Sequence, residues 1–324
     1  MKKIILISLL LGSALTLNAQ QVDYSVVSVD AEEGLNLVKI SKDDDQICMP
    51  EVRRNGKELE WWTGRVISIS PSQELGFLAY KNNTSNVFVR NLDSGESARQ
   101  RTNRQLVLDF SFSPDGSKIC FSEQQGGMNR IFTTDAKTGF VCRQITENAQ
   151  DYTPTYSPDM QQIFFARQEG VNLSIWGFNL NDNSVSSYTS GFNPYPMNDG
   201  KSILCTRKSA SGRCEIWRVD YTTGVEECIL SSPDSSFTTP SVSPDGEWML
   251  LVGKSIIHTP NFSYPNTDIY VCKMDGTQLT QLTHHAANDV SPVWSLDGKY
   301  IYFVSQRGSA KATANIWRMN FNLK

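Results

Sequence analysis

The sequence predicts an all-β fold, a six-bladed β-propeller of four-stranded antiparallel blades. First, a Ser-Pro-Asp-Gly turn at residues 113–116 joins a short apolar run to an alternating strand. Proline presets φ, aspartate bonds nearby N–H groups and glycine accepts positive φ, so this motif favours a tight turn. Second, the pattern recurs every 40 to 52 residues, a period typical of propeller blades. Third, no stretch has a sustained helical period.

Each copy reads strand, turn, strand, loop, strand, turn, strand, here called A to D. The third copy shows this order best, with strands expected over Thr153–Tyr156, Gln162–Arg167, Ser174–Leu180 and Ser184–Thr189. The other copies are centred on Pro71, Pro114, Asn198, Pro244 and Leu296. The C strands share an isoleucine followed by an aromatic residue. Because these pairs alternate with polar residues, we expect them to pack between blades: Ile131-Phe132, Ile175-Trp176, Ile216-Trp217, Ile269-Tyr270 and Ile316-Trp317.

Residues 1–19 have the pattern of a cleavable signal peptide. Lys2 and Lys3 precede an apolar run over Ile4–Leu11, and small residues end at Ala19. No cysteine follows the expected cleavage site, and no later segment approaches 18 apolar residues. We therefore expect an exported protein, periplasmic or secreted, with no transmembrane segment and no lipid anchor.

Residues 20–324 are predicted to form a single propeller domain closed by an N-terminal strand. Leu35–Ser41 resembles the strands that end other blades, whereas the last copy stops at its third strand, Asn315–Met319. Sharing the final blade between the two chain ends removes exposed sheet edges. Residues 46–62, with the pair Asn55-Gly56, read as an irregular hairpin before blade one, or as the beginning of a degenerate seventh blade.

The repeated unit resembles the WD-like repeat of TolB-type propellers. The resemblance is carried by Ser-Pro-Asp-Gly, a following Lys-x-Ile-x-Phe, the Ile-aromatic strand, the turn Asp275-Gly276 and a Leu-Thr ending, over roughly Val66–Met319. It implies a periplasmic or secreted propeller that binds other envelope proteins. TolB-type proteins carry a separate N-terminal α/β domain, whereas this sequence has only about 45 residues there, without a helical pattern.

Candidate binding residues lie in the D–A and B–C loops, where propellers usually bind ligands at the channel mouth. Asp151 and Asp289 each precede a proline by three residues, which places them at equivalent positions, and His284 and His285 share the loop of Asp289. Carboxylate and imidazole at one mouth suit a divalent cation. No metal-ligand spacing supports this, and we expect no cofactor. The Asp residues of the turns face the other way and are expected to be structural.

The B–C loop of blade five, Gly253–Asp268, is the most distinctive predicted insertion. It carries His258, Phe262 and Tyr264 beside two prolines. Exposed aromatics suit an interaction surface, although the loop can also fold them onto its own blade. Arg307, in the neighbouring loop Ser305–Ala314, is expected on the basic side of that surface.

Several functions are disfavoured by absent motifs. There is no Gly-x-Ser-x-Gly elbow, phosphate loop, dinucleotide fingerprint or His-Glu-x-x-His. A net charge of −4 with no basic tract argues against nucleic acid as a partner. The seven cysteines have no Cys-x-x-Cys spacing; Cys205 and Cys214 can face each other across a hairpin, and Cys120 and Cys272 are expected to be buried.

The leading hypothesis is an exported, non-catalytic TolB-like propeller that acts as a protein–protein interaction module of the cell envelope. The rival is a carbohydrate-binding propeller, or a metal-dependent oligosaccharide lyase that works at the central channel. The three histidines of the chain, two of them adjacent, match such a lyase poorly.

Overall fold

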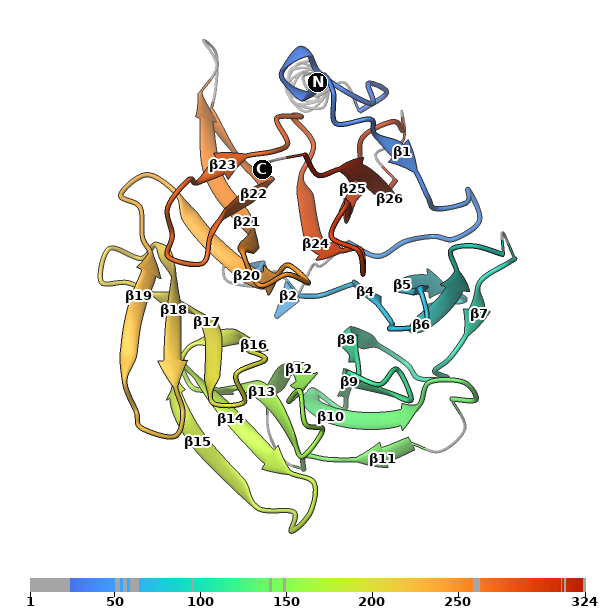
Figure 1. The fold of residues 1–324 in the computed structure, drawn as a ribbon. Helices are drawn as coiled ribbons and strands as arrows, with labels where there is room; N and C mark the ends of the chain where they lie inside the picture. Colours follow the sequence, from blue (N-terminus) through green and yellow to red (C-terminus); the bar gives the residue numbers. More distant parts are fainter. Residues whose placement is uncertain are drawn as a thin grey trace, which may run out of the picture.

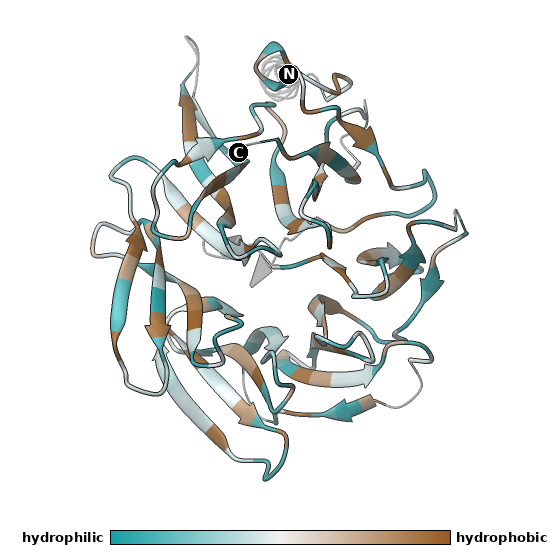
Figure 2. Cartoon of the chain, viewed as in Figure 1, coloured by the Kyte–Doolittle hydropathy of each residue, from teal (hydrophilic) through white to brown (hydrophobic). Residues whose placement is uncertain are grey.

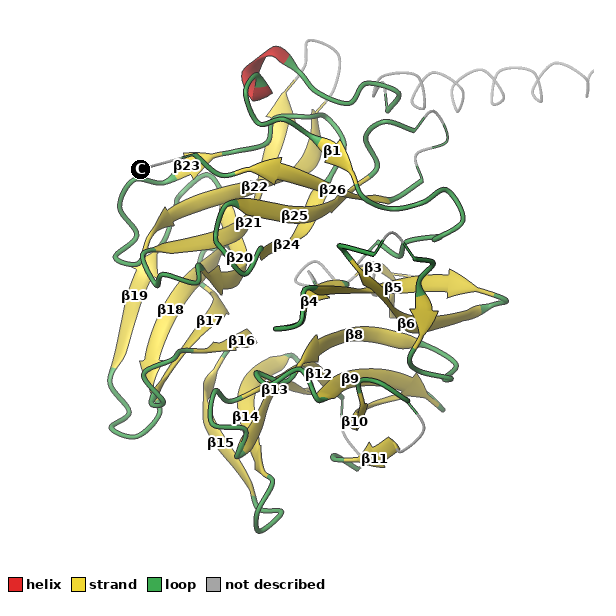
Figure 3. Cartoon of the chain, turned by 45° about the vertical axis from the view of Figure 1, so that its right-hand side comes forward, coloured by secondary structure: helices red, strands yellow, loops and turns green. Residues whose placement is uncertain are grey.

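The computed structural model contains six four-stranded antiparallel sheets arranged in a ring (Figure 1). It describes residues 24–49, 53–54, 57–58, 64–94, 96–139, 142–147, 150–258, 263–309, 311 and 313–322. The predicted six-bladed propeller is confirmed. The only helical element in these ranges is the single 3-10 turn η1, Asp30–Glu32, drawn in red in Figure 3. The expected signal peptide lies outside the described residues.

Blades one to three follow one another along the chain, each with its A strand innermost. Blade one contains β4 (Ile67–Ile69), β5 (Glu74–Lys81), β6 (Thr84–Asn91) and β7 (Arg99–Gln100). Blade two contains β8 (Val107–Phe112), β9 (Lys118–Gln125), β10 (Met128–Asp135) and β11 (Cys142–Gln144). Blade three contains β12 (Asp151–Tyr156), β13 (Gln162–Glu169), β14 (Asn172–Asn179) and β15 (Val185–Ser190), close to the predicted bounds.

Blades four to six complete the ring. Blade four contains β16 (Phe192–Pro196), β17 (Ser202–Lys208), β18 (Cys214–Asp220) and β19 (Glu226–Leu230). Blade five contains β20 (Ser236–Val242), β21 (Trp248–His258), β22 (Ser263–Lys273) and β23 (Thr280–Gln281). Blade six contains β24 (Asp289–Trp294), β25 (Tyr300–Ser305), β26 (Asn315–Asn320) and the N-terminal β1 (Val38–Lys39).

The two ends of the chain close the ring, as predicted. β1 runs antiparallel to β26, with Val38 opposite Arg318 and Lys39 opposite Trp317. Between this strand and blade one, β2 (Arg53–Arg54) pairs with β3 (Lys57–Glu58) in a separate two-stranded sheet. Closure leaves no open sheet edge at either end of the ring.

Apolar residues recur within the strands, whereas many of the connecting loops are hydrophilic (Figure 2). The isoleucines of the five Ile-aromatic pairs are fully buried: Ile131, Ile175, Ile216, Ile269 and Ile316. Their aromatic neighbours are buried or half-buried. These pairs therefore belong to the packing between strands and blades, as expected from their alternation.

Two local predictions were wrong. Gly253–Asp268 is not a loop, because β21 continues to His258 and β22 begins at Ser263, and the two pair in register along that whole length. Cys205 and Cys214 are both free thiols. The register of β17 and β18 places Cys205 opposite Trp217 and Cys214 opposite Lys208, so the two thiols do not face each other. Cys120 and Cys272 are buried within strands, as predicted.

Candidate ligand-binding site

The predicted site residues divide among three places in the structure. Asp151 and Asp289 do begin equivalent A strands, β12 and β24, but both are fully buried rather than displayed at a rim. Asp151 accepts a hydrogen bond of 2.8 Å from Nε of Arg167. Burial raises the pKa of Asp151, and Arg167 opposes that rise. This pair holds β12 and β13 together at one point of blade three.

Arg307 corrects a second expectation, because it lies in the interior and not on a basic surface. Its guanidinium donates to both carboxylate oxygens of Glu32, at 2.8 and 3.0 Å, and it is also paired with Asp289. All three side chains are fully buried. A buried arginine is stable only when paired in this way, and the pairing ties the N-terminal segment to blade six.

The two adjacent histidines border this ionic cluster in different ways. The backbone N–H of His284 donates to Glu32 at 2.8 Å, and its side chain is exposed. His285 is buried, and its Nδ1 accepts a hydrogen bond from the backbone N–H of Ala287. Burial works to raise the pKa of Glu32, but Arg307 and two backbone N–H groups lower it below its usual value.

His258 and Tyr264 belong to the long hairpin of blade five, and Phe262 lies outside the described residues. His258 is exposed at the end of β21, with Nδ1 2.7 Å from the hydroxyl of Ser263. Tyr264 is half-buried. Among the described residues, no group of three or more His, Cys, Asp or Glu side chains is placed to hold a metal ion. The binding roles expected of these residues stay predictions.

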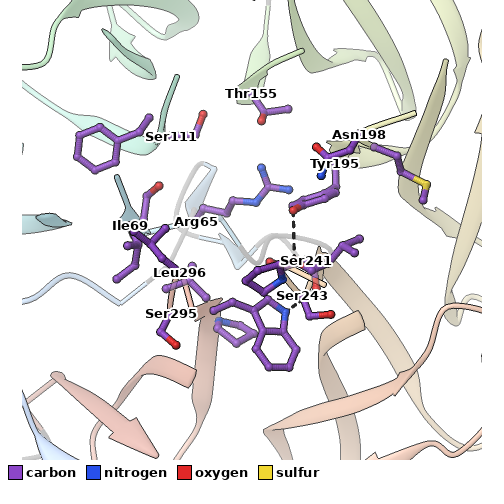
Figure 4. A pocket seen from close by; sticks show the side chains of 18 of the residues that line it. Arg65, Ile69, Ser111, Thr155, Tyr195, Asn198, Ser241, Ser243, Ser295 and Leu296 are labelled. Atoms are coloured by element: carbon purple, nitrogen blue, oxygen red, sulfur yellow. Dashed lines mark hydrogen bonds between the residues drawn. The ribbon is translucent and has the colours of Figure 1, made fainter. Parts of the chain in front are cut away.

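The main cavity lies at the opposite mouth of the channel, beside the A–B turns. Its volume is about 430 Å³, and none of the seven predicted residues that the structure describes lines it. Its walls come from the ends of the A strands and from the turns of blades four to six, including Tyr195, Val242, Ser243, Trp294 and Leu296 (Figure 4). The binding loops predicted from the sequence lie at the other mouth.

The floor of this cavity is the side chain of Arg65, which precedes β4. Its Nη2 donates to the carbonyl oxygen of Pro194 at 2.9 Å. Residue 194 belongs to blade four, three blades away from blade one in a ring of six, so the arginine reaches across the channel. The guanidinium carbon lies 5.7 Å from the centroid of the Tyr195 ring. Figure 4 shows the arginine extending between the blades toward Tyr195.

The A strands share a second feature that sequence reasoning missed. In blades three to six, the residue before a proline has a positive φ: Thr153, Asn193, Thr239 and Ser291. The strand register shifts at each of these points. Positive φ is rare for a threonine and marks positions where backbone geometry serves a purpose. Here the bulges bring backbone and side-chain groups to the neighbouring blade, as in the bond from the N–H of Val66, beside blade one, to the hydroxyl of Ser291 in blade six.

A signal for these residues was present in the sequence. The pairs Thr153-Pro154, Asn193-Pro194, Thr239-Pro240 and Ser291-Pro292 stand at the same place in successive repeats. Arg65 is a single charged residue next to an apolar A strand, in a repeat whose turn motif is weak. Repeat alignment finds the first pattern, but it cannot say that Arg65 crosses the ring.

Comparison with known proteins assigns the chain to a family. The family model described as the TolB beta propeller domain matches residues 63–259, more than half of the chain. The chain belongs to the TolB beta propeller domain family. TolB from Agrobacterium tumefaciens is similar at 17% identity and a TM-score of 0.60, with 81% of this chain and 93% of that chain covered. TolB from Acinetobacter baumannii is similar at 19% identity and a TM-score of 0.61, with 78% of this chain and 64% of that chain covered.

Enzymes share the same fold as these TolB propellers. An oligogalacturonate lyase in complex with manganese is similar at 11% identity and a TM-score of 0.55, covering 80% of this chain and 90% of that chain. At such low identity, all three likenesses extend to the fold alone, because one propeller scaffold serves many functions.

Proposed function

We propose that this TolB-family chain is an exported, non-catalytic propeller that serves as a protein–protein interaction module of the cell envelope. Membership of the family and the signal-peptide pattern of residues 1–19 support export. In the described part of the chain, no helix is long and apolar enough to cross a membrane.

The observation that carries this proposal is the long hairpin of blade five. β20 pairs with β21 only as far as Lys254, whereas β21 continues through Ser255–His258. Along these four residues β21 has β22 on one side and no described strand on the other. Figure 1 shows the end of this hairpin, in orange, running out beyond its neighbours. An unpaired strand edge is a template on which an extended segment of another protein can add a strand.

The surroundings of this edge indicate the charge of the partner. A cavity of about 270 Å³ lies beside it, between the hairpin and the B–C loop of blade four. Its described lining includes Lys208, Arg213 and Lys254, and no acidic residue. Ile256 in the same lining is 45% exposed. Electrostatic complementarity therefore favours an acidic, extended segment with an apolar residue for Ile256.

The chemistry of the main cavity supports a binding role without catalysis. Its polar side chains are mostly hydroxyls, and the one carboxylate among the described lining residues is Asp199. That carboxylate accepts backbone hydrogen bonds from Lys201 and Ser202 at 3.0 and 2.8 Å. Burial works to raise the pKa of Asp199, but those hydrogen bonds and Arg218 keep it below its usual value. Asp199 is therefore suited to stabilising a turn and not to proton transfer.

The test is site-specific photo-crosslinking in cells that export the protein. A photoreactive residue at position 256 should give an adduct with an envelope protein, whereas one at Val171, an exposed residue of the B–C turn in blade three, should not. Adding Lys254→Glu and Arg213→Glu should weaken the adduct about tenfold, equivalent to about 1.4 kcal/mol. Equal adducts at both positions, or indifference to charge reversal, would count against the hairpin as the binding element.

The rival function, cleavage of acidic oligosaccharides, is favoured by one observation, the fold shared with oligogalacturonate lyase. Incubation of the exported protein with oligogalacturonate and manganese would settle this point. Lyase chemistry leaves an unsaturated sugar whose ultraviolet absorbance rises with time. We expect no rise, and a rise that disappears in Arg65→Gln would replace the proposal.

A further inference from the structure

The central cavity contains a cation without a contacting anion. Among the described residues, the side chain of Arg65 makes one hydrogen bond, from Nη2 to the carbonyl oxygen of Pro194, and no ion pair. A guanidinium carries five N–H donors in a planar fork that matches a carboxylate. Most of the hydrogen-bonding capacity of Arg65 is therefore available to a group that enters the cavity.

Asp109, the acid whose charge acts on this arginine, does not neutralise it by contact. Asp109 acts on Arg65 only through space, and one of its oxygens accepts a hydrogen bond from the N–H of Thr153 at 3.2 Å. Asp109 is buried in β8 and is not part of the cavity lining. Burial lowers the pKa of Arg65, partly offset by Tyr195 and Asp109, because desolvation of its charge is only partly compensated. An entering anion would supply that compensation.

The walls of the cavity define the rest of the ligand. Ile69, Phe112, Val293 and Trp294 line it together with several hydroxyl groups. The indole N–H of Trp294 donates to the backbone oxygen of Ser241 at 3.1 Å, so it is already used within the protein. A volume of about 430 Å³ lies within the range of small-molecule sites. Apart from Asp199, whose carboxylate accepts hydrogen bonds within its own turn, the walls suit an apolar body and Arg65 suits one negative charge.

We propose that the central cavity binds a carboxylate carried on an apolar body, with the carboxylate held by Arg65. The free C-terminus of a peptide and a small organic acid share this chemistry. An oligouronate is disfavoured because it carries one carboxylate on every sugar, whereas the described lining contains a single cation. The site lies at the opposite channel mouth from the blade-five hairpin, so it is independent of the proposed partner surface.

The test is calorimetric titration of the exported chain with defined probes. The peptide arm uses acetyl-Val-Leu-Phe with a free carboxylate against the same tripeptide as its C-terminal amide, and the small-acid arm uses 3-phenylpropionate against its amide. We expect at least one free acid to bind and its amide to bind at least tenfold more weakly. The arm with the tighter acid identifies the source. Equal binding of acid and amide, or no binding of either acid, overturns the proposal.

Substitutions locate the site. Arg65→Gln should weaken the acid by about ten- to a hundredfold, and Arg65→Lys by less, since lysine keeps the charge but not the fork. Arg99→Gln, at an exposed ion pair of blade one, should change nothing. If Arg65→Gln does not fold, as judged by circular dichroism, Leu296→Glu tests the same point. Leu296 lies at the rim and is 40% exposed, so the added charge should repel the acid, whereas Leu296→Gln should not. Unchanged affinity in these variants overturns the proposal.

Discussion

Asp268 is a buried carboxyl group in a place that favours its protonated form. It lies in β22, accepts a hydrogen bond of 3.0 Å from the amide of Asn266, and is 2% exposed. Burial, followed by the charge of Asp289, raises its pKa to about 8, against the opposing effects of Thr283 and Arg307. The cluster of Glu32, Asp289 and Arg307 already contains more negative than positive charge, so protonation of Asp268 relieves it.

This carboxyl group should make stability fall as pH rises. The folded state holds a proton that the unfolded state has released above about pH 4, so folding loses stability up to about pH 8 and little beyond. Asp268→Asn should therefore unfold at a higher temperature than the wild type at about pH 9 and flatten the pH dependence of the unfolding temperature from about pH 7 to 9. Thermal unfolding followed by circular dichroism measures both quantities.

This pH range is chosen so that the titration of Asp268 dominates the change in stability. Burial raises the pKa of Asp109 and of Asp289 to about 6, so both are largely ionised above about pH 7, where the comparison begins. Asp275→Asn, at a turn where the carboxylate is exposed, is the control and should leave the slope unchanged. If the unfolding temperature of Asp268→Asn changed with pH as steeply as that of the wild type, the proton retained on folding would belong to another group.

For single residues, the sequence predicted equivalent positions better than it predicted burial and ion-pair partners. Arg307 looked like a surface cation because its partner Glu32 stands 275 positions earlier in the chain. Asp151 and Asp289 were correctly placed as equivalent, because both precede a proline by three residues. The strand register sets Arg167 opposite Asp151, whereas Arg307 lies two residues beyond Ser305, the residue opposite Asp289, so neither partner could be found from sequence spacing.

At the scale of elements, the A–B turn is a repeated hydrogen-bonded unit. In blade two, the hydroxyl of Ser113 donates to Asp115 at 2.6 Å and accepts from the N–H of Lys118 at 2.9 Å. The bond from Ser113, then backbone N–H groups, lower the pKa of Asp115. The same serine-to-backbone bond recurs in blades three, five and six. The motif identified from sequence is thus structural, as predicted for its aspartates.

Removing one of these hydroxyls should weaken its blade. Ser113→Ala leaves the buried end of the turn without a donor and an acceptor, and should lower the free energy of unfolding by about 1–2 kcal/mol. Urea unfolding measures the change. Ser187→Ala, at an exposed position of β15, is the control and should stay within about 0.5 kcal/mol of the wild type. A loss of similar size at both positions would mean that the turn bond contributes nothing specific.

The long hairpin shows where sequence patterns mislead at this scale. Two prolines, Pro260 and Pro265, suggested a loop, because proline cannot donate to a central strand. In the structure Pro265 lies opposite Ile256, in the part of β22 that β23 does not reach. A proline is tolerated on such an edge, since its missing N–H has no partner to lose. Local composition could not reveal that the strands run on past their sheet.

At the scale of the whole molecule, the repeat period was enough to predict the ring. Six copies with four strands each determine the number of blades, and the missing fourth strand of the last copy indicates how the ring closes. The position of the cavity was not predictable in this way. The position of the cavity depends on which channel mouth the side chains of several blades line. Arg65 can reach the opposite blade only when the ring is closed.

Several contacts join the chain ends, among them two that each span about 275 positions. One is the ionic cluster of Glu32 and Arg307. The other is β1, where the N–H of Ile40 donates to the oxygen of Ile316 at 2.8 Å and the hydroxyl of Ser41 accepts from the N–H of Ile316 at 3.1 Å. Contacts between such distant positions stabilise the closed ring, and opening the pairing of β1 exposes the edge of β26.

The closing strand can therefore be tested by removing one donor. Ile40→Pro deletes the N–H that bonds to Ile316 and should lower the free energy of unfolding by about 1–3 kcal/mol. Amide hydrogen exchange should speed up in β26 and in β1, because their pairing opens first, while blade three on the far side keeps its protection. Ile40→Val retains the N–H and most of the apolar contact, so its exchange pattern should match the wild type. If Ile40→Pro instead accelerated exchange equally in all six blades, the ring would open as one cooperative unit and not at its seam.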